Sequence, residues 1–93
     1  MSIVNFKCAD TEHLFTKGKS RRFANVKTVA ERKLAQLEAA VTLESLRASP
    51  GNRLEALHGD RSGQHSIRIN DQWRLCFRWS DQGPCDVEMV DYH

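Results

Sequence analysis

The hydrophobic residues of this chain change their spacing at Ser49-Pro50-Gly51-Asn52, and this change constrains the fold more than any other feature. Before it, apolar residues recur every three or four positions, as on one side of a helix. After it, they alternate with polar residues, as in half-buried strands. The proline and the turn-forming residues around it end the helical pattern. Helices followed by consecutive strands predict an α+β fold, in which an N-terminal strand and two helices pack on one face of a mostly antiparallel sheet.

Two helices are expected in the first half of the chain. Asp10 can cap a short helix that passes through Phe15 and ends at Gly18. A longer helix follows, which Asn25 or Thr28 can cap and which is expected to continue to the proline turn. One side of this longer helix is apolar, as expected for a helix that covers a core. Its apolar residues are Val26, Val29, Ala30, Leu34, Leu37 and Val41.

Alternation of apolar and polar residues predicts strands in the second half of the chain and at its start. In residues 73–79, Trp73, Leu75, Phe77 and Trp79 share one face, which we assign to the core. On that face the two tryptophans are expected to pack rather than to stack on nucleic-acid bases. The predicted strands are residues 2–8, 53–57, 64–70, 73–79 and 86–91.

The length of 93 residues allows one domain, residues 1–93, because so short a chain buries only about 60% of the surface of its unfolded state. No apolar run approaches the roughly 18 residues of a membrane span, and the first residues lack the apolar segment of a secretion signal. We therefore expect a cytoplasmic protein that does not contact a membrane. Its three cysteines are odd in number, and Cys76 is expected to be a small buried hydrophobe.

Charge is distributed unevenly, although the formal net charge is only +2. Residues 17–33 contain seven basic residues and one acidic residue, whereas residues 81–91 contain four acidic residues and no basic one. A basic segment attracts polyanions such as RNA through the release of counterions, but it can also be an ordinary solvated surface. The residues proposed for RNA contact are Lys17, Lys19, Arg21 and Arg22.

The connection between the two clearest strands predicts a pairing register. A three-residue link, Asn70-Asp71-Gln72, pairs Ile67 with Leu75, so that both apolar faces point to the same side of the sheet. The same register sets Arg68 directly opposite Arg74 on the exposed face. Like charges in this position repel each other, so a phosphate between them is one explanation. Alternatively, each guanidinium points into water or pairs with Asp86 or Glu88.

No histidine, cysteine or carboxylate spacing in the sequence matches a metal site, and there is no glycine-rich phosphate loop or C-x-x-C pair, so no metal and no cofactor are expected. Arginines together with histidine and tyrosine suit RNA cleavage by attack of the 2′-hydroxyl on its own phosphate. This reaction needs a base, a cation beside the phosphorane and an acid for the leaving oxygen. Asp91-Tyr92-His93, at the end of the sequence, could supply such groups or could be an ordinary frayed end.

Three segments in the same order resemble the HigB-type toxins of the RelE superfamily. They are His58-Gly59-Asp60-Arg61, Asn70-Asp71-Gln72-Trp73-Arg74 and Asp91-Tyr92-His93. The resemblance extends over nearly the whole chain. It implies a RelE-like fold and a toxin that enters the ribosomal A site and cuts the messenger RNA there. It also implies a HigA-type antitoxin as partner, and through that antitoxin an indirect contact with operator DNA.

The resemblance also assigns roles to residues. Arg74 matches the family's phosphate-stabilising arginine, and Tyr92 and His93 match a terminal pair needed for activity, together with Asp91. The chain departs from a relative at two positions: it has His58 where the relative has lysine, and Glu55 where the relative has histidine. The general base is therefore open among Glu55, His58 and Tyr92, and these departures suggest a weaker or slower nuclease.

Two other functions are compatible with this resemblance, because one fold supports several activities. The same scaffold is used by gyrase poisons of the ParE type. A non-catalytic protein that acts as corepressor with its antitoxin is the third alternative. The terminal Tyr92 and His93 favour the nuclease.

Overall fold

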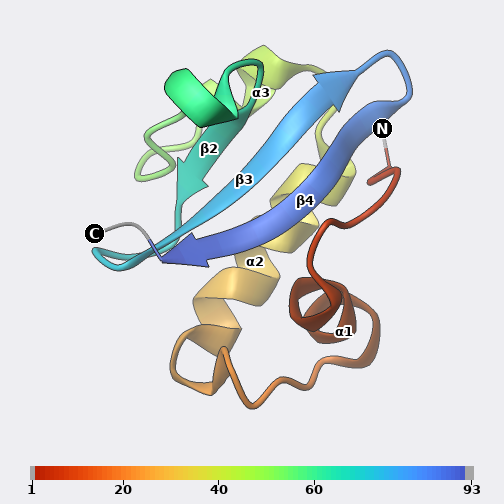
Figure 1. The fold of residues 1–93 in the computed structure, drawn as a ribbon, viewed down its shortest axis with the longest axis vertical. Helices are drawn as coiled ribbons and strands as arrows, with labels where there is room; N and C mark the ends of the chain where they lie inside the picture. The colour runs from red at the N-terminus through yellow and green to blue at the C-terminus, as the bar shows by residue number, and fades with distance from the viewer. Residues whose placement is uncertain (1, 92–93) are drawn as a thin grey trace.

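The computed structural model describes residues 2–91 and shows helices packed against a four-stranded antiparallel sheet (Figure 1). The order of the strands in the sheet is β1-β2-β3-β4. The predicted α+β fold is therefore confirmed. The elements are α1 (Ala9–Lys17), η1 (Ala24–Val26), α2 (Lys27–Ala39), α3 (Leu43–Arg47), β1 (Glu55–Ala56), η2 (Gly59–Arg61), β2 (His65–Arg68), β3 (Trp73–Ser80) and β4 (Gly83–Asp91).

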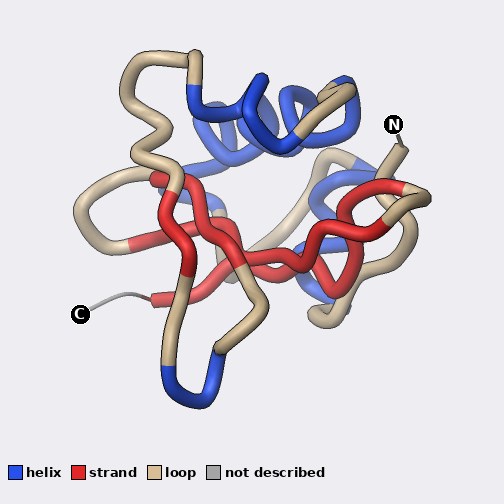
Figure 2. The backbone as a smooth tube through the Cα atoms, turned by 90° about the horizontal axis from the view of Figure 1, so that it is seen from above, coloured by secondary structure: helices blue, strands red, loops and turns tan. Residues whose placement is uncertain are grey.

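The two faces of the sheet have different neighbours. Helix α2 lies behind the sheet in Figure 1, and the segment that carries η2 projects from the opposite side, as the view from above shows (Figure 2). The core lies between the helices and the sheet, where burial of apolar side chains provides the main stabilisation. Trp73 and Trp79 pack against this core, as predicted. Its fully buried members include Leu14, Phe23, Leu34, Leu37, Ile67, Leu75, Phe77 and Val87.

Helix α1 ends as predicted, but it begins differently. Gly18 adopts the left-handed conformation with a φ of 69°, and its N–H donates to the carbonyl of Leu14 at 3.0 Å. Glycine reaches this conformation without the clash that a Cβ atom would cause. Asp10 was expected to cap the helix, but it lies inside the first turn, and Cys8 occupies the cap position without a side-chain hydrogen bond. There the carboxylate faces the positive end of the helix dipole.

The long helix predicted to continue to the proline turn is in fact two helices. α2 ends at Ala39, Ala40 is extended, and α3 begins after Thr42, whose Oγ1 accepts a hydrogen bond from the Ser45 N–H at 3.2 Å. Consecutive β-branched residues and a good N-cap at this point favour the start of a new helix over the continuation of the old one. Val41, expected in the apolar stripe, is consequently 69% exposed.

Neither predicted cap of the long helix is used. The N-cap residue of α2 is Val26, which makes no side-chain cap bond, and the 3₁₀ turn η1 leads directly into the helix. Val26 itself is buried in the core. Burial of this side chain, rather than side-chain capping by Asn25 or Thr28, therefore fixes where α2 begins.

The predicted strand at residues 2–8 is reduced to one isolated parallel bridge, between Phe6 and Val87. The segment still follows β4, because the Lys7 N–H donates to the Val87 carbonyl at 2.9 Å. A regular ladder is interrupted at Asp86, which has a φ of 52° and whose N–H donates to the Asn5 side-chain oxygen at 2.7 Å. A side chain thus replaces the backbone partner that a strand would supply.

The strand register predicted from the apolar faces is confirmed. Ile67 pairs with Leu75, and Arg68 pairs with Arg74. β1 is shorter than expected, and β4 begins at Gly83 rather than at Asp86, so that only a tight turn separates it from β3. Between Cys76 and Arg78 the register shifts by one residue, because β4 has one residue more than β3 at this bulge. Within residues 2–91, none of the helices is long and apolar enough to cross a membrane.

His65 on β2 makes folding stability depend on pH. Its Nδ1 is buried without a hydrogen-bond partner and its ring lies 6.2 Å from that of Phe77, centroid to centroid. Burial, with a smaller contribution from Arg47, lowers the pKa of this imidazole. His65 therefore stays neutral to a lower pH in the folded protein than in the unfolded chain, whose imidazole takes up a proton below a pH of about 6.5.

The free energy of unfolding is expected to fall as the pH drops below about 6.5, and the contribution of His65 to this fall ends below its lowered pKa in the folded state. Urea titrations between pH 7.5 and 5 measure the slope. His65→Asn should show a shallower slope than the wild type over this interval. Equal slopes in the two proteins would contradict a role for His65.

Candidate active site

Arg74 lies on the sheet face opposite the helices. The prediction that this face leaves it exposed is wrong, because Arg74 is buried. Its side chain is only 8% exposed. Nε donates to Ser66 Oγ at 2.8 Å, and Nη2 donates to the carbonyl oxygen of Arg53 at 2.7 Å. The alternation of residues in the strands predicts that this face is polar and exposed to solvent. In the structure it is covered by Ser66, Arg53 and the segments around them. The guanidinium is thus held in one orientation by neighbours from β2 and from the segment before β1.

A guanidinium in this position requires polar partners, because a buried charge without them is strongly destabilising. Arg53, whose carbonyl accepts one of these bonds, has a φ of 47°, a conformation that is uncommon for residues other than glycine. A cation fixed in advance stabilises developing negative charge without rearranging at the moment of reaction. Arg74 therefore has the environment of a charge-stabilising group.

Arg68 lies opposite Arg74 in the register, but the two guanidiniums contact different groups. The Arg68 guanidinium pairs with Asp71 in the turn between β2 and β3, while Arg74 is directed toward the β1 side. The two like charges are thereby turned away from each other. The predicted phosphate between them is therefore unnecessary to explain the pair.

The alternative prediction, that these arginines pair with Asp86 or Glu88, is wrong, because both carboxylates contact other arginines. Glu88 Oε1 accepts from Arg61 Nη1 at 2.8 Å, and Asp86 lies 3.6 Å from Arg78 Nε. Two of the four acidic residues in the stretch 81–91 are thus paired with arginines, although the stretch itself contains no basic residue. The basic stretch is neutralised less, through contacts of Asp10 with Arg22 and of Glu31 with Lys27.

Two of the three candidate bases lie in the described part of the chain. Glu55 Oε1 lies 3.9 Å from Arg74 Nη2, and the Glu55 side chain is 52% exposed. His58 is exposed and precedes η2. The structure thus brings Glu55, but not His58, into contact with the arginine. Tyr92 and His93 lie outside the described residues.

Asp91 closes β4 at the edge where β3 begins. It pairs in register with Trp73, so its Cα lies on the helix side of the sheet and not on the side of Arg74. The Gln72 Nε2 donates to Asp91 Oδ2 at 3.1 Å. This hydrogen bond joins the end of β4 to the turn before β3, and the role of Asp91 in activity stays a prediction.

The floor of the polar face contains a thiol. Cys76 is fully buried, as predicted, and pairs with Ser66 on one side and Glu88 on the other. Burial raises the pKa of the Cys76 thiol, which keeps it protonated and unreactive at neutral pH. Over residues 2–91, no group of three or more His, Cys, Asp or Glu side chains is arranged to hold a metal ion.

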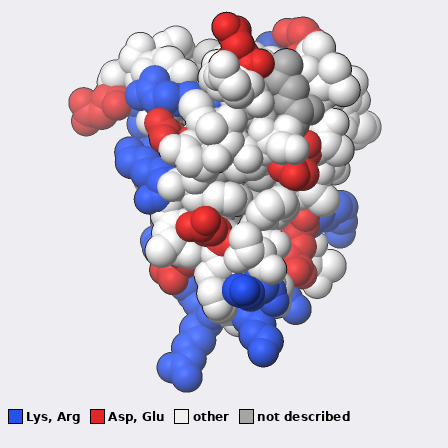
Figure 3. Space-filling view, turned by 90° about the vertical axis from the view of Figure 1, so that its right-hand side faces the viewer, with Lys and Arg blue, Asp and Glu red and all other residues white. Residues whose placement is uncertain are grey.

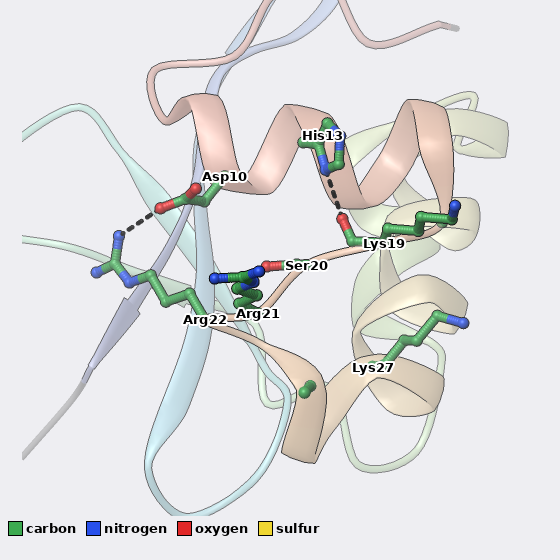
Figure 4. Close-up of a pocket in the computed structure, with 9 residues that line it drawn as sticks. Asp10, His13, Lys19, Ser20, Arg21, Arg22 and Lys27 are labelled. Atoms are coloured by element: carbon green, nitrogen blue, oxygen red, sulfur yellow. Dashed lines mark hydrogen bonds and ion pairs between the residues drawn. The ribbon is translucent and has the colours of Figure 1, made fainter.

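The basic residues of the α1–α2 link surround a separate cavity of about 820 Å³ (Figure 4). His13 Nδ1 donates to the Lys19 carbonyl at 2.6 Å, and Arg22 reaches Asp10 at 3.5 Å. Lysine and arginine side chains gather at this end of the molecule (Figure 3). Lys17 is exposed but does not line the cavity. The lining residues are Asp10, His13, Gly18, Lys19, Ser20, Arg21, Arg22, Ala24 and Lys27.

Trp73 connects this basic region to the sheet. The Arg22 guanidinium carbon lies 5.8 Å from the centroid of the Trp73 ring, and Phe23 meets the same ring edge to face at 5.2 Å. Such a cation over an aromatic face is attracted by the ring quadrupole. The tryptophan that pairs with Asp91 at the end of β4 therefore also orders the C-terminal part of the basic link.

The sequence was compared with known families and proteins. Residues 4–93 match the profile of the family described as HigB-like toxin, the RelE-like toxin of type II toxin-antitoxin system HigB. The chain belongs to the HigB-like toxin family. The resemblance drawn from its motifs is thereby confirmed.

Relatives of this HigB-like protein agree with the assignment. It is 39% identical over 80 residues to Toxin HigB-1 of Vibrio cholerae serotype O1, covering 84% of each chain. It is 34% identical over 58 residues to an uncharacterized protein of Haemophilus influenzae, covering 62% of this chain and 57% of that one. A solved structure, the YoeB/ParE toxin from Agrobacterium tumefaciens, covers all of both chains with a TM-score of 0.61 and 18% identity. This last likeness supports the fold.

Sequence reasoning missed the residues that hold Arg74. Ser66 lies on a polar strand position, and a strictly alternating pattern marks it only as solvent-facing. Arg53 acts through its backbone carbonyl, which has no side-chain signature. The position of Lys33 could have been noticed in the sequence, because it lies three residues after Ala30 on the apolar side of α2. The structure shows that it is only 8% exposed.

Proposed function

We propose that this HigB-like toxin is an endoribonuclease that cuts messenger RNA in the ribosomal A site and so inhibits translation. The observation that carries the proposal is the fixed Arg74 guanidinium with the Glu55 carboxylate 3.9 Å away, on one face of the sheet. A cation held beside a carboxylate can serve the attack of a 2′-hydroxyl on the adjacent phosphate. Family membership supports the same reaction class.

The proposed reaction requires three groups from the chain. A base takes the proton of the 2′-hydroxyl, whose oxygen forms a bond to phosphorus. Arg74 stabilises the negative charge of the pentavalent intermediate. An acid, for which we propose His93, gives a proton to the 5′-oxygen as its bond to phosphorus breaks. The products are a 2′,3′-cyclic phosphate and a free 5′-hydroxyl.

Glu55 is our first choice of base, since it is the candidate in contact with Arg74. Replacement of a positioned base lowers the rate by about 10²–10⁴-fold. Glu55→Gln is therefore expected to lose cleavage by a factor in this range. His58→Gln, a change of similar size in the adjacent exposed loop, serves as the comparison and should lose less than about tenfold.

Single-turnover cleavage on programmed ribosomes measures both variants. The reverse order of effects would assign the base to His58, and full activity in both would leave Tyr92 as the candidate. A third variant, Glu55→His, introduces the histidine that the relative has at this position. Faster cleavage in this variant would support the view that this chain is a slower nuclease, and equal cleavage would contradict it.

We propose that the basic link binds ribosomal RNA. Arg21→Glu combined with Arg22→Glu is expected to weaken ribosome binding at least about tenfold at low salt and to reduce the salt dependence of the affinity, because fewer counterions are released. The fold should survive, since Arg22 loses an exposed ion pair with Asp10 and contacts with the rings of Phe23 and Trp73, each of which is worth about 1 kcal/mol or less. Sedimentation with ribosomes over a salt series measures this.

The matched control reverses two charges elsewhere. Lys7→Glu with Arg47→Glu gives the same change in net charge on exposed positions outside the link. A loss of binding equal to that of the link variant would show that only net charge matters. No loss in the link variant would contradict RNA contact by this segment.

Membership in a type II toxin family implies an antitoxin partner. We propose that this partner is of the HigA type, that the toxin reaches operator DNA only through it, and that the protein acts in the cytoplasm. Co-expression with the neighbouring open reading frames, followed by affinity purification through the toxin, identifies the partner. Recovery of no companion protein that restores growth would contradict the proposal.

One experiment separates the nuclease from a ParE-like gyrase poison and from a corepressor. The protein is added to a translating extract and the 5′ ends of the messenger are mapped, while a parallel reaction measures DNA breaks stabilised by gyrase. Cuts that require ribosomes support the nuclease. Intact messenger with stabilised breaks would favour the poison, and neither effect would favour the corepressor.

A further inference from the structure

A buried asparagine joins two helices and a strand close to Arg74. Asn52 is completely buried, and its Oδ1 accepts a hydrogen bond from Lys33 Nζ on α2. Its Nδ2 donates to the Gln36 side-chain oxygen at 3.1 Å and to the Leu46 carbonyl at 3.0 Å. Its own carbonyl accepts from the Arg68 N–H at 2.6 Å. Asn52 therefore links α2, α3 and β2 at the point where the chain turns toward β1.

The next residue is the one that holds the arginine. Arg53 has a φ of 47°, and its carbonyl accepts the hydrogen bond from Arg74 Nη2 at 2.7 Å. A non-glycine residue stays in this conformation only when the surrounding structure determines it. Asn52 is held both through its side chain and through its backbone carbonyl. These hydrogen bonds fix the residue before Arg53 and so determine the conformation of Arg53. The orientation of the Arg53 carbonyl thus depends on the side chain of Asn52.

Stability alone does not explain why a lysine is buried at position 33. It is 8% exposed on the apolar side of α2, and burial, Arg32 and Arg68 all lower the pKa of its ammonium. Within residues 2–91 it makes no ion pair with a carboxylate, and its amide partner is Asn52. An apolar residue of similar length would pack there at a lower energetic cost. The contact with Asn52 is the interaction that this buried lysine makes in place of an ion pair.

We propose that Asn52, held by Lys33, is a positioning residue that fixes the Arg53 carbonyl and, through it, the guanidinium of Arg74. Asn52 acts through Arg53 and Arg74 and does not touch the reacting atoms. The consequence for catalysis depends on the proposed nuclease activity, whereas the consequence for Arg74 does not. The two are therefore tested by different measurements.

The first measurement is the NMR resonance of the Arg74 Nε–H group, which is assigned by its loss in Arg74→Lys. Asn52→Ala should shift or broaden this resonance, because the guanidinium loses its fixed carbonyl partner. Leu14→Ala is the matched control: Leu14 is also fully buried, but it lies on α1 and outside the hydrogen-bonded cluster. An unchanged Arg74 resonance in Asn52→Ala would overturn the proposal, whether or not the protein is a nuclease.

The second measurement is single-turnover cleavage at a temperature where all variants are folded. Misplacement of a catalytic group by about 1 Å can cost about 10²-fold in rate, so Asn52→Ala should lower kcat by up to this factor and leave KM unchanged. Leu14→Ala, with an equal or larger loss of thermal stability, should keep its kcat. Equal kcat values in the two variants would overturn the catalytic part of the proposal.

Lys33→Met provides a variant that is not expected to unfold. Methionine has a similar length and removes a buried charge, but it leaves Asn52 Oδ1 without its donor, so the two effects oppose each other and the melting temperature should change little. If Lys33 serves Asn52, kcat should nevertheless fall about tenfold and the Arg74 resonance should shift. A kcat and an Arg74 resonance that both equal those of the wild type would overturn the inference for Lys33.

Discussion

Arg74→Lys is expected to lower the rate of RNA cleavage by about 10²–10³-fold, the usual effect of removing one fixed donor beside a developing charge. Lysine keeps the positive charge, but it cannot donate to Ser66 and to the Arg53 carbonyl while presenting a planar guanidinium. Binding to ribosomes should remain within about twofold of the wild type, because the charge is retained. Single-turnover cleavage and ribosome sedimentation measure the two effects separately.

The choice of lysine matters because alanine would leave buried acceptors without their donor, which destabilises the fold. The control is Arg78→Lys on the same strand, where the guanidinium is exposed and lies 3.6 Å from Asp86. This variant should cleave at nearly the wild-type rate. Wild-type cleavage by Arg74→Lys, with the control equally active, would remove Arg74 from the reaction.

His93→Ala is expected to lower cleavage by about 10²–10⁴-fold, the usual contribution of a general acid. The family resemblance assigns His93 to activity, and an imidazole titrates close enough to neutrality to give up a proton at that pH. A substrate in which sulfur replaces the 5′-bridging oxygen distinguishes the acid from other roles. A thiolate leaves without a proton, so His93→Ala should cleave this substrate nearly as fast as the wild type does.

The base variant is the control for this rescue. Glu55→Gln should remain slow on the sulfur substrate, since loss of the base affects the attacking oxygen and not the leaving group. If His93→Ala stays slow on both substrates, His93 is not the acid and instead positions the RNA. If both variants cleave the sulfur substrate nearly as fast as the wild type, the bond to the leaving group breaks before the 2′-hydroxyl loses its proton. This result would contradict the assignment of Glu55 as the base.

Much of the fold could be predicted because it follows from periodicity. The change of spacing at the proline turn separates helices from strands, and the need to put Ile67 and Leu75 on the same side fixes the register. Boundaries were less predictable. The break after Ala39 depends on a local cap at Thr42, and the N-terminal strand was lost where Asn5 bonds Asp86 through its side chain. Local competition of this kind leaves no trace in hydrophobic spacing.

The candidate site was predicted only in part. Motif resemblance identified Arg74, and the register placed it opposite Arg68. Strand alternation indicated an exposed face, and this was wrong, because residues around position 53 and in the η2 segment fold over the sheet from outside the strands. Such coverage comes from contacts between distant parts of the chain. The buried Asn52 looked like an ordinary turn former for the same reason.

The edges of the sheet show how this protein meets other chains. A long, flat edge strand offers a row of unpaired backbone groups to which another chain can add. Here β1 is only two residues long and carries the charged Glu55, and beside β4 the N-terminal segment supplies backbone and side-chain partners as far as Lys7. Strand addition is thus hindered at both edges. We therefore expect a partner to recognise the charges and shapes of side chains on this molecule rather than to add a strand to its sheet.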